Sequence, residues 1–359
     1  MNKALIAMSG GVDSSVAAYL IKQQGFDCIG ATMKLFANED IGINAGKTCC
    51  SLDDVEDARA VSHKLGIPFY VFNFTADFRK HVIGRFIHAY QNGETPNPCI
   101  DCNRFMKFEK LFIRAKQLDI NYIVTGHYAR IEYDNVSKRY LLKKAIDETK
   151  DQSYVLYSMT QEQLQHTIFP LGKLRKTEIR NLAAKKGFVN ATKQDSQDIC
   201  FVPNGDYADF IEKYTNSVSP KGRFMDTSGN DLGEHKGIVR YTIGQRKGLG
   251  ITAPKPLYVC SICSKSNNVI VGTEEKLYSK ALIARNINLI SVESLNAPLR
   301  INAKIRYKQQ EQPATVCRLD TDTLRIEFDK PQRAITKGQA VVLYDGDIVI
   351  GGGTIYEVI

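Results

Sequence analysis

No apolar run in this chain approaches the roughly 20 residues that a membrane-spanning helix needs. The short apolar segment near the N-terminus is interrupted by Asp13 before it reaches the length of a secretory signal. Internal repeats and low-complexity tracts are also absent. These absences argue against a membrane protein, a secreted protein and a repeat array, and we expect a cytoplasmic protein with no membrane partner.

The chain also lacks the cysteine pattern of a small secreted domain. It has nine cysteines, an odd number, scattered over 359 residues. Secreted frameworks usually place an even number of cysteines in a short chain. We therefore expect a reducing compartment rather than a disulfide scaffold.

Acidic residues are outnumbered by basic ones. The chain has 39 Asp and Glu against 48 Lys and Arg, a formal net charge of +9. Lys and Arg clustered on one face would favour an anionic partner, although an ordinary basic enzyme is the alternative. The length and the 43% hydrophobic content predict two or three domains with their own cores.

Up to about residue 200, short β-rich runs alternate with longer helical patterns. This alternation predicts an α/β domain in which helices cover both faces of a parallel sheet. The expected strands are 4–7, 28–33, 69–74 and 122–125, and the expected helices are 14–24, 51–65, 78–91 and 104–118.

The pattern changes after residue 203. Many Gly, Lys and Arg residues with weak periodicity predict a small, loop-rich central domain, and short alternating runs then predict a C-terminal antiparallel β-barrel or sandwich. Asp345 and Gly346 between two apolar runs predict a hairpin. The expected domains are 1–203, 204–275 and 276–359.

The segment "MSGGVDSS" (8–15) joins the first expected strand to the first expected helix. Gly10 and Gly11 let the backbone approach a ligand closely, and the serine hydroxyls and helix N-terminus favour an anion. Asp13 would repel a bare phosphate, so we expect it to stand at the helix end or to bind Mg²⁺. An ordinary Gly-Ser turn that caps a helix is the alternative.

A second segment, "GINAGKT" (42–48), resembles a Walker A phosphate loop. It has three residues between its glycines where that motif needs four, and no clear strand precedes it. We therefore do not expect Lys47 to bind phosphate.

Two cysteine segments suggest sulfur or metal chemistry: "TPNPCIDCNRFMKF" (95–108) and "DSQDICFVP" (195–203). The helical pattern after Asn103 would place Cys102 near a helix N-terminus, where the positive end lowers the pKa of a thiol. Cys102 is therefore a candidate nucleophile. Cys200 is a second reactive thiol, a buried structural cysteine or, with Cys99 and Cys102, a ligand of zinc or an Fe–S cluster.

The glycine-serine loop resembles the pyrophosphate loop of the PP-loop ATP pyrophosphatases. The whole set of motifs resembles the tRNA-specific 2-thiouridylase family (MnmA type), and this resemblance covers essentially the whole chain. The motifs that carry it are "SGGVDSSVAA" (9–18), "TPNPCIDCNRFMKF" (95–108), "TGHYAR" (125–130), "KDQSYVLY" (150–157), "DSQDICFV" (195–202), "YTIGQRKGLGI" (241–251), "IRYKQQ" (305–310) and "GGGTI" (351–355).

The resemblance implies sulfur transfer to the wobble uridine of tRNA. ATP would adenylate O2 of the base, releasing pyrophosphate, and Cys200 would carry the incoming sulfur as a persulfide. Cys102 would attack this persulfide, leaving a disulfide that an external reductant must open. The implied cofactors are ATP and Mg²⁺, and the implied partners are tRNA and the sulfur-donor protein of a cysteine desulfurase relay.

The resemblance also implies a role for individual residues. The catalytic residues would be Cys102 and Cys200, with no metal site. ATP would be bound by Ala7, Met8, Ser9, Gly10, Gly11, Val12, Asp13, Ser14, Met33 and Gly126. tRNA would be contacted by Asn97, Pro98, Cys99, His127, Lys150, Asp151, Gln152, Arg306, Tyr307 and Gln339, with the first three at the target base.

Alternatives stay open at several of these positions. His127 could be a hydrogen-bonded histidine at a strand end. Many family members carry Asp where this chain has Cys99, and a third sulfur favours the alternative of an Fe–S cluster held by Cys99, Cys102 and Cys200. A PP-loop enzyme acting on a small molecule and a noncatalytic RNA-binding or Fe–S protein are the other candidates.

The C-terminal half offers a further argument for an RNA partner. In "LRINAKIRY" (299–307), Arg300, Lys304 and Arg306 fall on one face of an expected strand. Such a face is usually just solvated, but the flexible basic loop "GQRKGLG" (244–250) adds a second place for phosphate contact.

Overall fold

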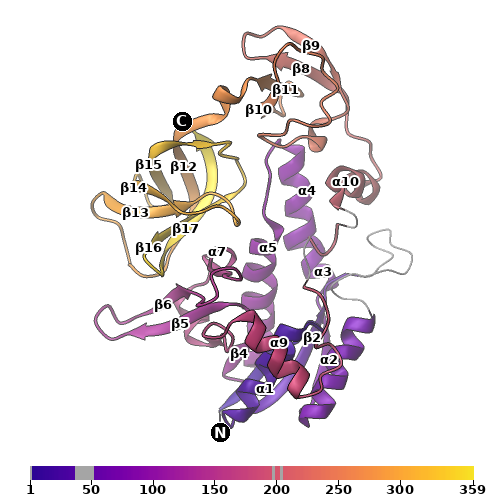
Figure 1. Cartoon of the computed structure of the whole chain (residues 1–359), viewed down its shortest axis with the longest axis vertical. Coiled ribbons are helices and arrows are strands. Elements are labelled where there is room, and N and C mark those ends of the chain that lie inside the picture. Colours follow the sequence, from indigo (N-terminus) through magenta and orange to yellow (C-terminus); the bar gives the residue numbers. More distant parts are fainter. Residues whose placement is uncertain (1, 37–51, 196–198, 203–204) are drawn as a thin grey trace.

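The computed structural model describes residues 2–36, 52–195, 199–202 and 205–359 (Figure 1). The Walker-like segment 42–48 lies outside these residues. Within the described part of the chain, no helix is both long and apolar enough to cross a membrane.

The N-terminal part is built on a five-stranded sheet with the order β3-β2-β1-β4-β7. Every neighbouring pair in this sheet is parallel, which confirms the predicted α/β fold. The strands are β1 (Lys3–Ala7), β2 (Asp27–Lys34), β3 (Phe69–Asn73), β4 (Tyr122–Val124) and β7 (Thr167–Ile168).

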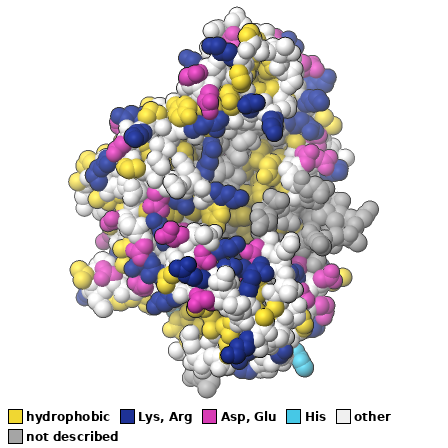
Figure 2. All heavy atoms as spheres, in the orientation of Figure 1, with side chains coloured by type: hydrophobic (Ala, Val, Ile, Leu, Met, Phe, Trp, Pro, Cys, Tyr) yellow, Lys and Arg dark blue, Asp and Glu magenta, His cyan; other side chains and the backbone are white. Residues whose placement is uncertain are grey.

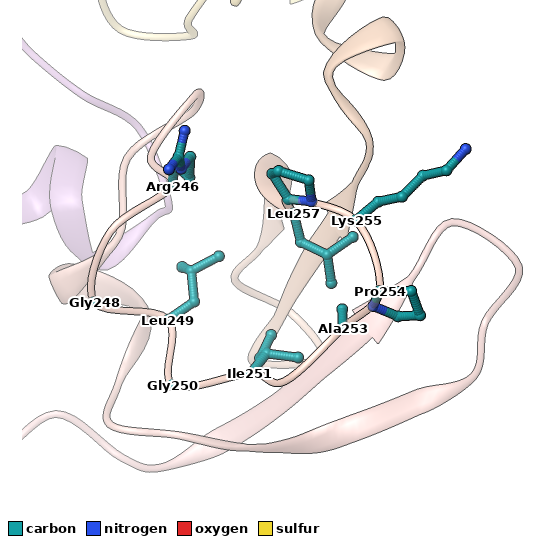
Figure 3. A pocket seen from close by; sticks show the side chains of 10 residues that line it. Arg246, Gly248, Leu249, Gly250, Ile251, Ala253, Pro254, Lys255 and Leu257 are labelled. Atoms are coloured by element: carbon teal, nitrogen blue, oxygen red, sulfur yellow. The ribbon is translucent and has the colours of Figure 1, made fainter.

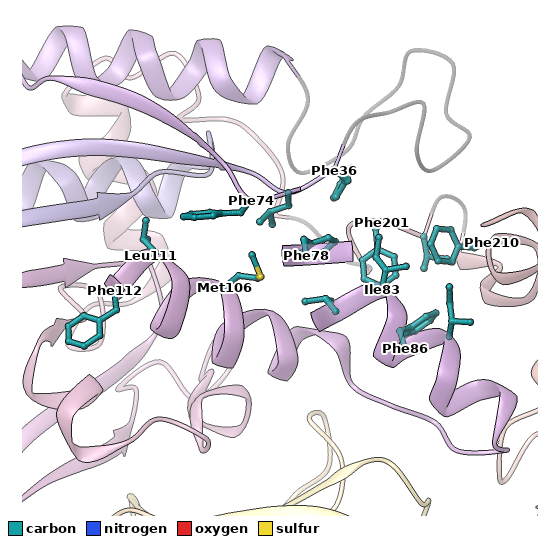
Figure 4. Close-up of a cluster of buried hydrophobic side chains, with 14 of the residues drawn as sticks. Phe36, Phe74, Phe78, Ile83, Phe86, Met106, Leu111, Phe112, Phe201 and Phe210 are labelled. Atoms are coloured by element: carbon teal, nitrogen blue, oxygen red, sulfur yellow. The ribbon is translucent and has the colours of Figure 1, made fainter. Parts of the chain in front are cut away.

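Hydrophobic clusters cover both faces of this sheet. Ala4 and Ile6 of β1 point into a cluster with α1 (Val12–Gln23), α2 (Leu52–Leu65) and α9 (Lys176–Lys185). Leu5, between them, points to the opposite face, as the two-residue period of a strand requires. The side chains of that second cluster appear in Figure 4.

The helices on the second face form two continuous stretches, each made of three segments. The first stretch runs through α3 (Thr75–Phe78), η2 (Arg79–Ile83) and α4 (Gly84–Gln91). The second runs through α5 (Pro98–Asp101), η3 (Cys102–Lys110) and α6 (Leu111–Gln117). η2 and η3 are π-helical, a geometry that is rare and often found at functional sites.

The central part contains α10 (Tyr207–Thr215) and a four-stranded sheet with the order β10-β11-β8-β9. Its strands were not predicted, because this part of the chain is rich in Gly, Lys and Arg and shows weak periodicity. They are β8 (Gly222–Asp226), β9 (Asp231–His235), β10 (Tyr258–Cys263) and β11 (Asn268–Gly272), accompanied by the short helical turns η5 (Ile238–Arg240) and η6 (Glu274–Leu277).

The C-terminal part is the predicted antiparallel barrel. β12 pairs with both β15 and β17 and so closes the sheet. The predicted hairpin joins β16 to β17, with Gly346 in the left-handed region at φ 55°. The strands are β12 (Tyr278–Leu289), β13 (Leu299–Lys304), β14 (Gln312–Arg318), β15 (Thr323–Arg333), β16 (Ala340–Asp345) and β17 (Ile348–Val358).

The N-terminal part contributes two strands to the barrel's sheet, which the sequence did not reveal. The hairpin of β5 (Ala129–Asp134) and β6 (Arg139–Lys144) is paired to β17 (Figure 1). Asp347 beside this junction lies 2.5 Å from Arg130 and 3.3 Å from Lys143. The barrel is therefore joined to the α/β part by strand pairing and by charge.

Short helices near this junction complete the contact. In α7 (Ser153–Leu156), the Tyr154 hydroxyl donates to the carbonyl of Ala340 at 2.8 Å. From the barrel, the Asn288 amide donates to the carbonyls of Tyr157 at 2.7 Å and Met159 at 2.9 Å. α8 (Gln161–Gln165) follows and begins with a capping box formed by Thr160.

Candidate active site at the carboxyl edge of the parallel sheet

The loop after β1 is closed by its own serines. The backbone N–H of Ser9 donates to Ser14 Oγ at 3.2 Å, and the hydroxyls of Ser14 and Ser15 both donate to the carbonyl of Gly11, at 3.0 and 3.1 Å. Asn190 also holds the loop, because its amide donates to the carbonyl of Gly10 at 2.9 Å. The loop is thus held in one conformation at the start of α1.

Two glycines let other segments pack directly against this loop. Gly10 has φ 75°, and a Cβ at this position would lie 2.3 Å from the carbonyl oxygen of Asp54. A Cβ on Gly126 would lie 2.8 Å from the backbone nitrogen of Ser14. The end of β4 therefore touches the N-terminus of α1, with no room for a side chain between them.

The predicted ATP-binding residues lie at one edge of the sheet. Ala7 ends β1 and residues 8–14 follow it, Met33 lies near the end of β2, and Gly126 follows β4. These three strands are neighbours and parallel, so their carboxyl ends meet at the edge where open α/β folds bind ligands.

Asp13 is already engaged by two groups that sequence analysis missed. Its carboxylate accepts from Lys176 Nζ at 2.7 and 2.8 Å and from the Tyr128 hydroxyl at 2.7 Å. Burial, followed by the charge of Asp13, raises the pKa of Tyr128, so this phenol stays protonated and donates. Asp13 lies in the first turn of α1, as predicted for a residue at the helix end. Its carboxylate is bound by Lys176 and Tyr128 and is not left open for Mg²⁺, the other prediction.

Lys176 also pairs with Asp195, at 2.7 Å. Asp195 forms ion pairs with two further cations, Lys150 at 2.8 Å and Arg180 at 3.2 Å. Burial by itself would raise the pKa of Asp195, but the hydrogen bonds from Lys150 and Lys176 outweigh it and lower the pKa to about 2. Asp195 is therefore a permanent anion among three cations.

The helix that carries Cys102 begins earlier than predicted. Asn97 is its N-cap and accepts from the N–H of Cys99 at 3.1 Å, and Pro98 occupies the first helical position, where no N–H is needed. The prediction that this helix starts at 104 was wrong. Cys102 consequently lies beyond the first turn, and the exposed Cys99 is the thiol nearest the positive helix end.

Cys102 and Cys200 pack against one hydrophobic cluster. Both side chains are partly buried and lie against the core that contains Met106, Phe86 and Phe201 (Figure 4). The Phe86 and Phe201 rings are 5.2 Å apart and nearly perpendicular. Two segments about 100 positions apart in sequence therefore share one anchoring surface.

Cys99, Cys102 and Cys200 do not form a metal site in this structure. Among the residues that the structure describes, no group of three or more His, Cys, Asp or Glu side chains is arranged to hold a metal ion.

Several predicted tRNA contacts bind other parts of the protein here. The Tyr307 hydroxyl donates to the carbonyl of Asp151 at 3.1 Å. The N–H of Tyr128 donates to Gln152 Oε1, and the N–H of Gln152 donates to the carbonyl of Tyr128, both at 2.9 Å. Burial raises the pKa of Tyr307, as do the nearby Asp151 and the exposed Cys99.

The barrel also holds the loop that precedes Cys99. The Gln339 amide donates to the carbonyl of Thr95 at 2.7 Å and to that of Pro96 at 3.3 Å, and the N–H of Thr95 donates to the carbonyl of Lys337 at 2.9 Å. Arg306 donates to the carbonyl of Ala334 within the barrel. The roles of these residues toward tRNA stay predictions.

His127 is buried, and both ring nitrogens have partners. Nε2 lies 3.3 Å from Lys107 Nζ and must accept, since an ammonium only donates, so Nδ1 carries the proton and donates to Thr125 Oγ1 at 2.7 Å. Burial, then the charge of Lys107, lowers the pKa of His127 well below 6.5. The predicted tRNA contact of His127 stays untested beside this structural role.

Basic residues outside the edge of the sheet are distributed over the surface. Figure 2 shows Lys and Arg side chains along the middle of one face, beside exposed hydrophobic ones. In β13, Ile301 and Ala303 are buried and Arg300 is exposed, as predicted, but Arg300 is paired with Asp329 at 2.7 Å.

The loop 244–250 borders a cavity of about 430 Å³ lined by Arg246, Gly248, Leu249, Gly250, Ile251, Ala253, Pro254, Lys255, Pro256 and Leu257 (Figure 3).

A Gly10→Ala substitution tests the closeness of the phosphate loop to α2. The added Cβ would clash with the backbone of Asp54 and adopt a strained φ, so we expect the melting temperature to fall by several degrees, as about 1–3 kcal/mol of backbone strain predicts. Gly11→Ala is the matched control, because its Cβ would lie 3.5 Å from Ser9 Oγ, at an ordinary contact distance. Equal melting temperatures for the two variants would contradict this packing.

The protonation of His127 can be followed by NMR. We expect its ring signals to stay in the neutral form between about pH 6 and 8, because the folded pKa lies well below 6.5. The neutral ring contributes stability that is present above pH 6.5 and is lost as the pH falls towards the folded pKa. A titration centred near pH 6.5 would contradict the buried, doubly bonded ring.

Comparison with known proteins places the chain among sequence relatives. Three family descriptions match successive parts: "tRNA methyl transferase HUP domain" (residues 2–204), "tRNA methyl transferase PRC-barrel domain" (208–273) and "Aminomethyltransferase beta-barrel domain" (279–355).

Curated relatives match over nearly their full length. The chain is 53% identical over 353 residues to the tRNA-specific 2-thiouridylase MnmA of Clostridioides difficile (strain 630), covering 98% of each chain. It is 52% identical to MnmA 1 of Thermoanaerobacter sp. (strain X514), covering 99% of this chain and 98% of that one. It is 51% identical to MnmA of Acetivibrio thermocellus, covering 98% and 99%.

Proposed function

Because the chain belongs to the tRNA-specific 2-thiouridylase family, we propose that it replaces O2 of the wobble uridine of tRNA by sulfur at the expense of ATP. It is an enzyme of the transferase class, and tRNA is its substrate. The observation that carries the detailed proposal is that a glycine-serine loop at the sheet edge and two cysteines on an adjoining core belong to one α/β unit.

In the first step, O2 of the uridine attacks the α-phosphate of ATP, and pyrophosphate leaves. The loop 7–14, Met33 and Gly126 bind the nucleotide, and the N-terminus of α1 with its serine hydroxyls stabilises the phosphates. Gly10 and Gly126 let Asp54 and the end of β4 pack directly against this loop, which supports a loop of fixed shape at the edge of the sheet. Mg²⁺ would enter with the ATP phosphates and neutralise part of their charge.

In the second step, sulfur replaces the activated oxygen. The Cys102 thiolate attacks the Cys200 sulfur of a Cys200 persulfide, so the bond to the terminal sulfur breaks and hydrosulfide leaves. Hydrosulfide adds to C2 of the adenylated uridine, and AMP departs with the former O2. The products are 2-thiouridine, AMP and a Cys102–Cys200 disulfide, which an external thiol reductant returns to two thiols.

The tRNA is held by the surface around Cys99. Asn97, Pro98 and Cys99 contact the target base, and His127, Lys150, Asp151, Gln152, Arg306, Tyr307 and Gln339 contact the tRNA. This assignment is supported by the way Cys99, Asp151 and Tyr307 lie together where the barrel meets the α/β part. The base must be splayed from its neighbours to reach a site of this kind.

The remaining predictions are part of the same proposal. The domains are 1–203, 204–275 and 276–359, the protein acts in the cytoplasm, and the persulfide is delivered by the donor protein of a cysteine desulfurase relay. A mechanism in which Cys99, Cys102 and Cys200 bind an Fe–S cluster is not favoured, since the described side chains do not gather into a metal site.

Replacing either thiol tests the two-cysteine mechanism. We expect Cys102→Ser and Cys200→Ser each to lower thiolation by about 10³-fold or more, as loss of other enzyme nucleophiles does, while tRNA binding is kept. The assay combines ATP, Mg²⁺, unmodified tRNA and a persulfide donor, followed by nucleoside analysis. Cys317→Ser in β14 is the control and should retain full turnover; full turnover by either catalytic-site variant would refute the mechanism.

A further inference from the structure

Two exposed arginines from separate helical stretches lie over one aromatic ring. The guanidinium carbon of Arg85, in α4, is 5.3 Å from the ring centroid of Phe105, and that of Arg104, in η3, is 5.4 Å from it. The imidazole of His81 stacks on the same ring at 5.2 Å. An aromatic face attracts a guanidinium and holds it flat, which leaves the N–H groups at its edge for other partners.

Most N–H groups of these two arginines have no partner in the described part of the chain. Arg85 donates from Nε to the carboxylate of Asp101 at 3.2 Å, and its two terminal nitrogens bond to no described residue. Arg104 forms neither an ion pair nor a hydrogen bond with a described residue. The two guanidiniums lie well within the distance of about 8 Å over which charges interact at physiological salt. The cluster therefore carries an excess of positive charge that an added anion would neutralise.

This positive cluster borders the surface that carries both reactive cysteines. Phe105 packs against the same hydrophobic cluster as Cys102 and Cys200. Arg104 follows Cys99 by five positions on one continuous helical stretch, which is about 7 Å along the helix axis. The free guanidinium edges consequently lie beside the residues that are proposed to contact the target base.

The two arginines also lie close to the barrel. Tyr157 packs against β17, because a Cβ on Gly352 would lie 2.8 Å from its ring. Burial raises the pKa of Tyr157 to about 12, while the nearby charges of Arg104 and Arg85 act in the opposite direction. The cluster is therefore found near the junction between the helices and the barrel.

We propose that Arg85 and Arg104 form a phosphate-binding site for the sugar–phosphate backbone of tRNA beside the target nucleotide. This inference rests on the proposed function and adds two residues to its tRNA-binding surface. A guanidinium binds two phosphate oxygens at once through parallel N–H groups, and two guanidiniums held on one ring are already oriented for such contacts. Phosphate contacts of this kind fix the position of the strand while the splayed base enters the site.

The test measures binding of unmodified tRNA to the Arg85→Gln/Arg104→Gln double variant over a range of salt concentrations. Loss of two phosphate contacts should lower the slope of log Kd against log salt by about 1.4, since each contact with a single strand contributes about 0.7. Binding at low salt should weaken by about tenfold or more. Arg85→Lys/Arg104→Lys keeps both charges and should retain most of the slope. A wild-type slope in the Gln double variant would overturn the proposal.

Arg59→Gln/Arg114→Gln is the matched control. Both arginines are exposed and also lie over phenylalanine rings elsewhere in the α/β part, Arg59 over Phe69 at 5.7 Å and Arg114 over Phe72 at 5.5 Å. This double variant loses the same charge, and its slope should equal that of wild type. An equal fall in slope in both double variants would assign the effect to net charge and overturn the proposal.

Further outcomes separate this site from a protein contact and from the proposed function. Wild-type tRNA binding combined with slower persulfide delivery from the donor protein would assign the arginines to that protein and overturn the proposal. Failure of wild type to bind and thiolate any tRNA would instead refute the proposed function. If the double variant does not fold, Arg104→Gln breaks no ion pair with a described residue and should lower the slope by about 0.7; an unchanged slope then overturns the proposal.

Discussion

A single buried ammonium, that of Lys176, organises the candidate active site. It lies between Asp13 at the start of α1 and Asp195 on the way to Cys200. Charges removed from water need close partners of opposite sign. Here the Lys176 ammonium and the two carboxylates neutralise one another. While both contacts hold, the first turn of α1 and Asp195 consequently cannot move apart.

Cys102 is held in place by other contacts. Cys102 belongs to a long helix that starts at Pro98, and the barrel grips the loop just before that start through Gln339 and Thr95. The barrel in turn shares a sheet with β5 and β6 of the α/β part. Hydrogen bonds between distant segments thus fix the start of the helix that carries Cys102, whereas the aromatic packing of Phe201 holds the chain beside Cys200.

Much of this architecture could be predicted because it depends on local patterns. Strand β1 is a short apolar run, and the Asp345-Gly346 turn predicts the β16–β17 hairpin without reference to the rest of the chain. The glycine-serine loop was recognised from two adjacent glycines and several serines between a short apolar run and a helical pattern, and the structure shows Gly10 at φ 75°, where a Cβ would meet Asp54. These features are encoded within a few neighbouring residues.

The features that escaped prediction depend on contacts between distant residues. Lys176 lies 163 positions from its partner Asp13, and nothing in a basic stretch distinguishes the one lysine that is buried. The start of the Cys102 helix was misplaced because apolar periodicity begins after Asn103, whereas the cap at Asn97 determines where the helix begins. The pairing of β6 with β17 likewise joins segments about 200 residues apart.

The central claim is that ATP activates the same uridine carbon that receives the sulfur. It can be tested with tRNA whose wobble uridine carries ¹⁸O at O2, followed by mass spectrometry of the AMP formed during thiolation. The account predicts that each 2-thiouridine is accompanied by one AMP whose phosphate carries the labelled oxygen. Accumulation of 2-thiouridine with unlabelled AMP would contradict it.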